Sequence, residues 1–223
     1  MAFLYKSSNR TNWSIGTTTS RTGPKWHQNP VSPMNAYDLY SSPVGFNFAG
    51  MSRAIAGRYM EAFVQRMPTR MNRLEELVRA RTAFTCTYSM SSVEAISVWF
   101  ASEIGVRPRT PAEIDAICAG AEWMRDDPGV MHELDERTLS LCADIGYYVC
   151  ETVRRTSLRL RWGVVYDNPK HVHYHRTCII GFRHGITVDP LSMTSTFAYG
   201  AWQNAVPPHH LARVASTMAS QVD

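Results

Sequence analysis

Apolar residues along the first two thirds of the chain recur every three or four positions, which is the spacing of one helix face. Pro68 is expected to end the first of these helices, because proline breaks the hydrogen-bond pattern of a helix interior. The stretches Ser91 to Glu94 and Thr110 to Glu113 each place a hydroxyl three residues before a glutamate, a pairing that caps helix starts. The pattern predicts helices over 55–67, 71–78, 91–104, 110–124 and 137–155.

The helix expected over 137–155 is apolar over more than half its circumference, so we expect it at the centre of the fold. Gly146 on this helix would let another element approach closely. The pattern then changes, and 158–166 and 172–182 predict two strands of a small antiparallel sheet, with a short third strand at 186–188. Asp189 and Pro190 are the cap and first residue of another helix, and a last helix follows 207–208. This order predicts the α+β class.

The first 45 residues differ from the rest in composition. By count, 18 of the 27 residues from 7 to 33 are Ser, Thr, Asn, Gly or Pro. The segment therefore has too few apolar residues to fold alone. We therefore divide the chain into an irregular basic arm at 1–45 and a single α+β domain at 46–223. Aromatic residues of the arm that could fix it to the domain or to a partner are Trp13, Trp26, Tyr37 and Tyr40.

Charge and composition narrow the function classes. The chain has 223 residues and a net charge of +4, but residues 1–60 hold six Lys or Arg against one Asp, which leaves 61–223 at −1. A near-neutral domain makes nucleic acid an unlikely partner. No run of 18 apolar residues occurs, so a membrane is not expected either. The five cysteines form no CxxC pair, which favours reduced thiols in a cytoplasmic protein over disulfides or zinc.

Two groups of residues could carry chemistry. His171, His173 and His175 alternate, so on a strand all three would point to one face, where imidazoles can bind a metal ion. With Asp189 nearby, they define an alternative in which the chain is a metal-dependent hydrolase. Asp144 and Glu151 lie seven residues apart on one side of the central helix, as either an acid–base pair or an ordinary polar face.

Other features favour a binding protein without enzymatic activity or cofactor. Phosphate-binding glycine loops, nucleophile elbows and HExxH are all absent from the sequence. A basic cluster follows the central helix and could contact an acidic partner; it comprises Arg154, Arg155, Arg159 and Arg161.

One set of segments matches a known pattern: Thr138 to Glu151, Leu160 to Gly163 and His171 to His175, with the later Asp189-Pro190 and Ala198-Tyr-Gly200. In these segments the chain resembles a loosely defined group of uncharacterised bacterial α+β proteins. Comparable families serve as immunity proteins against secreted bacterial toxins. The resemblance implies a protein that neutralises a toxin by covering its active cleft. Because the domain is nearly neutral, a toxin without a basic cleft is favoured.

The expected contacts to the partner are aromatic, arginine and histidine side chains, namely Arg154, Arg155, Arg159, Trp162, His171, His173 and His175. A second alternative to the immunity protein is a structural subunit of a phage-like or secretion assembly, in which the arm would thread into a neighbouring subunit.

Overall fold

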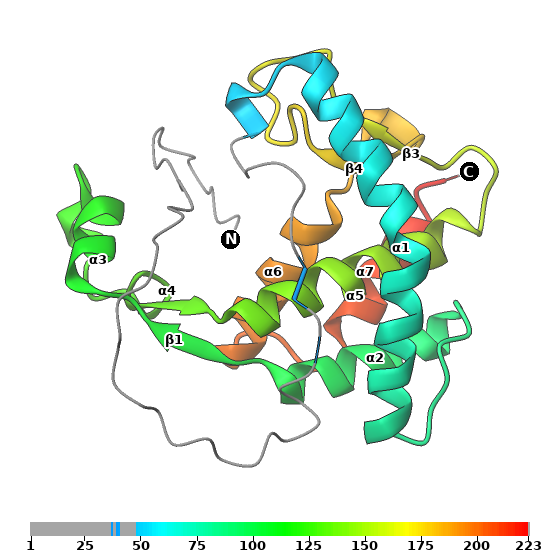
Figure 1. Ribbon diagram of the computed structural model, residues 1–223, viewed down its shortest axis with the longest axis horizontal. Helices are drawn as coiled ribbons and strands as arrows, with labels where there is room; N and C mark the ends of the chain where they lie inside the picture. The colour runs from blue at the N-terminus through cyan, green and yellow to red at the C-terminus, as the bar shows by residue number, and fades with distance from the viewer. Residues whose placement is uncertain (1–36, 38, 41–47, 223) are drawn as a thin grey trace, which may run out of the picture.

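The computed structural model describes residues 37, 39, 40 and 48–222 (Figure 1). Its composition of about 59% helix and 10% strand, with the strands in two small antiparallel sheets, confirms the α+β class. In chain order the elements are η2 (Phe48–Gly50), α1 (Arg53–Arg81), α2 (Met90–Glu103), β1 (Val106–Pro108), α3 (Pro111–Cys118), η3 (Glu122–Met124), α4 (Pro128–Met131), β2 (His132–Leu134), α5 (Glu136–Arg154), β3 (Arg161–Val164), β4 (Thr177–Ile180), η4 (Arg183–Gly185), α6 (Pro190–Trp202) and α7 (His210–Ala219).

Helix α1 runs straight through Pro68, so the two helices predicted over 55–67 and 71–78 are one. Pro68 lies on the exposed side of α1, and the flanking Met67 and Met71 are buried in the core. Burial of Met67 and Met71 therefore stabilises α1 by more than the loss of one backbone hydrogen bond at Pro68 destabilises it.

The predicted capping residue is correct for α3, and for α2 the predicted cap, Ser91, lies two residues after the actual one. Thr110 caps α3 in a reciprocal pair with Glu113, as expected. Helix α2 begins at Met90, and its cap is Ser89, which exchanges hydrogen bonds with Ser92 rather than with a glutamate. Helix α3 is also shorter than predicted, because it ends at Cys118 and a separate 3-10 turn follows.

The central helix is confirmed at Glu136–Arg154, and 15 of its 19 residues are buried. The most extensive contact of α5 is with α6, and α1, α2 and α7 cover the other sides of α5. The crossing with α6 depends on Gly146, where a Cβ would lie 2.8 Å from the carbonyl carbon of Pro190. Only glycine allows two helices to approach so closely.

The sheet after α5 is smaller than predicted. Strands β3 and β4 pair antiparallel, with Gly163 opposite Cys178, and they lie mainly against α1. The third strand is reduced to one bridge between Ile179 and Val188. The prediction of a strand through 172–176 is wrong. Tyr174 makes only an isolated parallel bridge to Val165, and His175 has a φ of 62°, outside the range of regular strands.

Residues 106–134 form a projection that we call the lobe (Figure 1). Its base is the antiparallel pair β1 and β2, which the sequence analysis did not predict because each strand has only three residues. Its outer part is α3, η3 and α4. Arg109, which follows β1, donates to the carbonyl oxygens of Gly129 and Val130 in α4 and of His132 in β2 at 2.6–2.9 Å, and so joins β1 to both elements. The outer elements project away from the helices around α5 (Figure 1).

Of the arm predicted at 1–45, the structure describes Tyr37, Leu39 and Tyr40, whereas Trp13 and Trp26 lie outside the described residues. None of the helices among the described residues is long and apolar enough to cross a membrane.

Candidate functional site

Two of the four arginines in the basic cluster are engaged within the protein, whereas Arg159 and Arg161 are exposed. Arg154 donates two hydrogen bonds of 2.7 Å to the Glu151 carboxylate, and Arg155 donates one of 3.1 Å. The Arg155 guanidinium also lies over the Tyr88 ring, 3.6 Å from its centroid. Arg159 is exposed on the loop that follows. Arg154 and Arg155, two of the three predicted arginine contacts, are therefore bound to Glu151. Among the described ion pairs and hydrogen bonds, none joins the third, Arg159, to this carboxylate.

Trp162 belongs to the same internal network. Its ring stacks on Tyr147 with centroids 5.1 Å apart, and its Nε1 donates to Glu151 at 3.3 Å. Burial tends to raise the pKa of Glu151, but the hydrogen bonds from Arg154 and Arg155 outweigh it, so the pKa is lowered. Glu151 is thus an ionised acceptor that joins β3 to α5. In this arrangement Trp162 is an internal packing residue.

The three histidines do not share a face. The rings of His171 and His173 are neighbours at 5.5 Å, and His173 Nδ1 lies 2.8 Å from the Thr187 hydroxyl. His175 is buried and stacks instead on Tyr174, with ring centroids 3.8 Å apart. Among the described residues, no three His, Cys, Asp or Glu side chains gather closely enough to hold a metal ion. The metal site proposed on a histidine strand is therefore not formed in this part of the chain.

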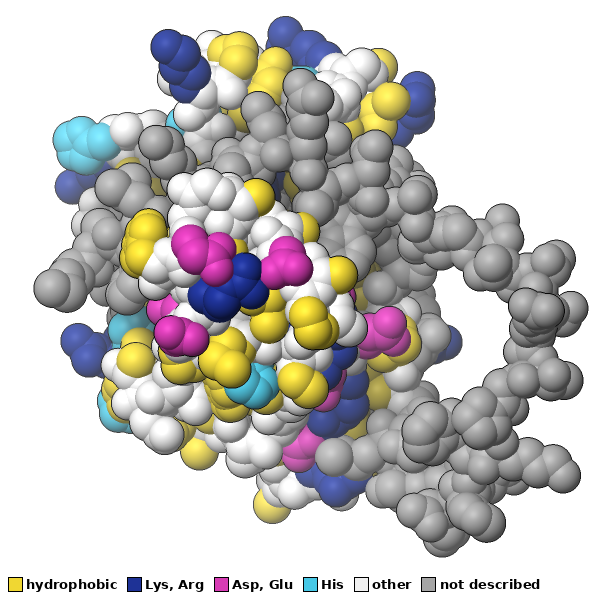
Figure 2. All heavy atoms as spheres, turned by 90° about the vertical axis from the view of Figure 1, so that its left-hand side faces the viewer, with side chains coloured by type: hydrophobic (Ala, Val, Ile, Leu, Met, Phe, Trp, Pro, Cys, Tyr) yellow, Lys and Arg dark blue, Asp and Glu magenta, His cyan; other side chains and the backbone are white. Residues whose placement is uncertain are grey.

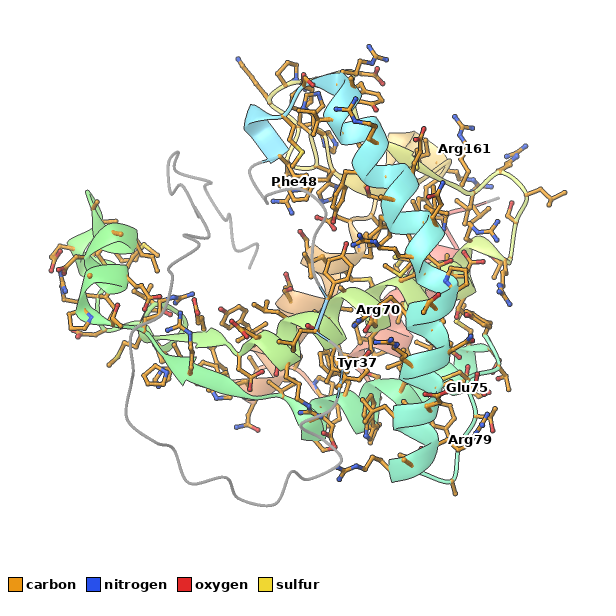
Figure 3. The ribbon with its side chains drawn as sticks, viewed as in Figure 1. Tyr37, Phe48, Arg70, Glu75, Arg79 and Arg161 are labelled. Carbon is orange, nitrogen blue, oxygen red and sulfur yellow. The ribbon has the colours of Figure 1, made fainter. Side chains whose placement is uncertain are left out.

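The two carboxylates of α5 lie in separate networks. Asp144 is fully buried and accepts hydrogen bonds of 2.9 and 2.6 Å from Nε and Nη2 of Arg70 on α1. Tyr37, which lies near Arg70 in Figure 3, donates its hydroxyl to the same carboxylate. Tyr40 donates its backbone N–H to Ser140 at 2.8 Å. Burial and the neighbouring Asp144 charge raise the pKa of Tyr37. Because Glu151 faces its own arginines, the two do not form an acid–base pair.

The network around Asp144 does confirm one expectation for the arm. Tyr37 and Tyr40 attach it to the domain, with the Arg70 guanidinium 5.3 and 5.9 Å from their ring centroids. The Tyr40 hydroxyl also lies 3.3 Å from that of Tyr59 on α1. These residues hold the start of the described chain against α1 and α5.

The end of the lobe exposes the aromatic side chain that stands out most on the described surface. Trp123 in η3 is 85% exposed, and Ile117 of α3 and Met131 of α4 are 39% and 42% exposed. Trp123 was not predicted from the sequence. Its signal was a tryptophan that follows Glu122 and lies off the apolar face of the helix predicted over 110–124.

Acidic side chains accompany this tryptophan. The lobe contains six carboxylates against three arginines, a net charge of −3 in a chain of net charge +4. Arg125 pairs with Asp115 at 2.8 Å and with Glu122, whereas Asp126 and Asp127 are exposed beside them. Figure 2 shows acidic and hydrophobic side chains gathered on the face that includes the lobe. The lobe end therefore combines an aromatic anchor with a negative rim.

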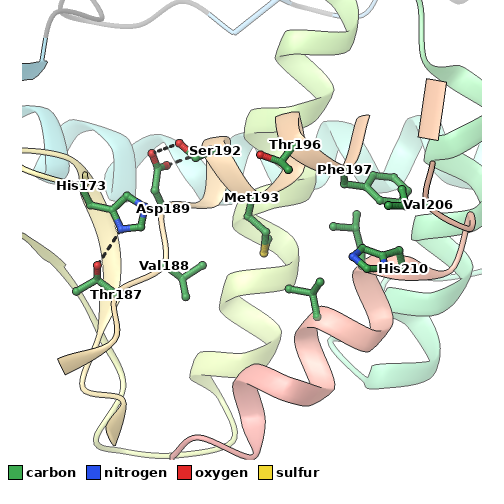
Figure 4. Close-up of a pocket in the computed structure, with 12 residues that line it drawn as sticks. His173, Thr187, Val188, Asp189, Ser192, Met193, Thr196, Phe197, Val206 and His210 are labelled. Carbon is green, nitrogen blue, oxygen red and sulfur yellow. Dashed lines mark hydrogen bonds between the residues drawn. The ribbon is translucent and has the colours of Figure 1, made fainter. Parts of the chain in front are cut away.

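A groove of about 370 Å³ lies between α6 and α7 (Figure 4). One end is polar and includes His173, Thr187 and Ser192. The other end is mostly apolar and includes Phe197 and Val214. Figure 4 shows these side chains converging on one space from the strand end and from both helices. The groove could not be predicted from the sequence, because its residues come from distant parts of the chain.

Comparison with known proteins adds no relative: no family model, no curated protein and no solved structure matches the chain. The resemblance to bacterial immunity proteins therefore stays a prediction.

Proposed function

We propose that the chain is a binding protein without enzymatic activity, and that it neutralises a bacterial toxin by covering the toxin's active cleft with the lobe. The observation that carries this proposal is Trp123, which is 85% exposed at the end of the lobe. Monomeric proteins rarely leave a tryptophan in water, and tryptophan is among the strongest anchors of protein interfaces.

The charge of the lobe favours a partner with a basic surface. The near-neutral charge of 61–223 as a whole favoured a toxin without a basic cleft. The lobe alone, however, carries −3, and Asp126 and Asp127 lie exposed close to Trp123 in the chain. A cleft that binds nucleic acid or nucleotide is lined with Lys and Arg, so an acidic projection would complement it in charge. The local charge therefore favours a toxin of that class.

The shape of the lobe supports insertion into a cleft. The lobe stands away from the helices around α5 on a two-stranded base (Figure 1). Tyr199 of α6 supports this base, since its hydroxyl lies 3.4 Å from the Leu134 backbone nitrogen. The ion pairs of Arg125 with Asp115 and Glu122 tie η3 to α3 and orient the loop that bears Trp123. Such pre-orientation lowers the entropy lost on binding.

A cytoplasmic location is part of the same proposal. It is supported by the five cysteines, all of which are free and four of which are buried. Buried thiols without disulfide partners are typical of proteins kept in a reducing compartment.

The test compares capture by tagged wild-type chain, Trp123→Ala and Leu158→Ala from the native lysate. Leu158 is the matched control, because it is also fully exposed but lies beside the basic cluster and not on the lobe. We expect one partner at a fixed ratio with wild-type chain and Leu158→Ala, and at least a tenfold weaker complex with Trp123→Ala. The purified partner should lose its toxic activity at equimolar wild-type chain.

Three outcomes would contradict the proposal: recovery of the chain alone, a complex that survives Trp123→Ala, or a partner whose activity the chain does not inhibit. Loss of the complex with Leu158→Ala alone would move the contact surface to the basic cluster with Arg159.

A further inference from the structure

The groove between α6 and α7 exists because the two helices pack mainly on other elements. Helix α6 lies chiefly on α5, and α7 lies chiefly on α2. Thr194 of α6 donates its hydroxyl to the Cys142 carbonyl at 2.6 Å, and Leu211 of α7 is fully buried and donates its backbone N–H to Ser97 at 3.3 Å. Both walls are thus fixed from behind. The space between their outer faces is part of the folded structure and needs no rearrangement to form.

The size and lining of the groove suit a small organic molecule. Its volume of about 370 Å³ lies within the range of roughly 300–1,000 Å³ typical of ligand sites, which are mostly apolar with a few polar groups. Here Met193, Phe197 and Val214 supply apolar walls, and the Ser192 and Thr187 hydroxyls mark one polar end.

The described lining of the groove includes one carboxylate and two imidazoles, those of His173 and His210. Among its described lining residues Asp189 is the one carboxylate, and Arg176 donates to it at 2.7 Å. The same carboxylate accepts the backbone N–H groups of Leu191 and Ser192 at the start of α6. Burial lowers the pKa of His173, which favours its neutral form. A charged ligand would lose its hydration, and the one carboxylate of the lining is already paired with Arg176.

We propose that this groove binds a small, uncharged and mostly apolar molecule that places one hydrogen-bonding group at the end formed by His173, Thr187 and Ser192. The site is separate from the lobe and does not depend on the proposed toxin binding.

The test uses two fluorescent probes that share one ring system. N-phenyl-1-naphthylamine is uncharged, and 8-anilinonaphthalene-1-sulfonate carries an added sulfonate. Titration of the full chain should give saturable enhancement with the uncharged probe at one site per chain, and about tenfold weaker binding of the sulfonate.

Variants locate the probe. Thr196→Trp on α6 and Val214→Phe on α7 both fill the groove, and each should weaken binding of the uncharged probe at least tenfold. Ser216→Trp adds the same bulk on the exposed side of α7 that faces away from His210 and Val214, and Trp123→Ala alters the lobe; neither should change the binding. Urea unfolding midpoints identify which groove variant keeps the wild-type fold, and that variant decides the result.

The proposal is overturned if wild-type chain shows no saturable enhancement with the uncharged probe, if the sulfonate binds more tightly at the same site, or if a folded groove variant binds the probe as wild type does. Because the lobe variant is tested in the same titration, failure here leaves the toxin proposal standing, and failure of that proposal leaves this one standing.

Discussion

Helices α5 and α3 both begin at a capped residue, but their surroundings are opposite. Around α5 most side chains are buried, and even its Asp144 is enclosed with an ion-pair partner. In α3 the one buried residue of the eight is Cys118, and the polar contacts of the helix lie at the surface. Packing by distant segments therefore stabilises α5, whereas capping and nearby ion pairs hold α3. A region held locally can keep its apolar side chains exposed for a partner.

The difference has an energetic consequence. A change near α5 disturbs contacts that many elements share, so it should lower the free energy of unfolding of the whole chain. A change in the lobe disturbs contacts within 106–134 and should be detected there first. Substitutions in the two regions can test this division.

The largest effect is expected from Asp144→Asn. The substitution removes the carboxylate charge to which Arg70, whose side chain is 9% exposed, donates two hydrogen bonds. Breaking a buried pair by removing one partner costs about 3–5 kcal/mol, and we expect a loss of that size in the free energy of unfolding. Urea denaturation followed by circular dichroism measures it.

The matched control for this prediction is the double variant Arg70→Met with Asp144→Leu. Replacing both charges with apolar groups should cost less than Asp144→Asn alone, because the double variant removes both members of the buried pair. A loss below about 1 kcal/mol in the single variant would show that water reaches the pair, and the description of α5 as a sealed centre would be wrong.

A smaller effect is expected from Gly146→Ala. Alanine favours helix by about 1 kcal/mol over glycine, but the new Cβ would lie 2.8 Å from the carbonyl carbon of Pro190 in α6. Because backbone cannot move aside cheaply, we expect a net loss of about 1–3 kcal/mol in urea denaturation.

Gly57→Ala on α1 is the comparison for Gly146. The nearest atom to its new Cβ is the Tyr166 hydroxyl at 3.3 Å, at the end of a side chain that can move. This variant should be close to neutral or slightly stabilised. If both glycine variants gain stability alike, the close crossing of α5 and α6 does not require glycine.

The elements that could be predicted from the sequence are those with local causes. The apolar arc of α5, the Thr110 cap and the Asp189 cap each depend on residues within a few positions, and each prediction is confirmed. The predictions at Pro68 and His175 were wrong. Helix α1 continues through Pro68 because distant segments pack against it on both sides, and no strand passes through His175 because its backbone is left-handed.

The candidate sites depend on contacts between distant residues. Tyr37 and Arg70 reach Asp144 across 107 and 74 residues, and no local pattern announces those separations. The exposure of Trp123 follows from the fold of the whole lobe on strands of only three residues. The basic cluster was visible in the sequence, but not that Glu151 would occupy two of its arginines.

The smallest effect, and the one that belongs to the lobe alone, is the titration of Glu113. Hydrogen bonds from Arg107 and from the backbone and hydroxyl of Thr110 lower the pKa of Glu113 from 4.5 to about 2. The ionised carboxylate therefore stabilises the lobe fully above pH 4.5, and this contribution is lost as the pH falls towards 2. Amide chemical shifts of Thr110 and Glu113, followed by nuclear magnetic resonance, should titrate with a midpoint near 2. Glu113→Gln should abolish this transition, and the α5 amides should titrate as they do in wild-type chain. A midpoint near 4.5 would mean that the cap and the Arg107 pair do not hold in solution, and then α3 would need support that local contacts do not provide.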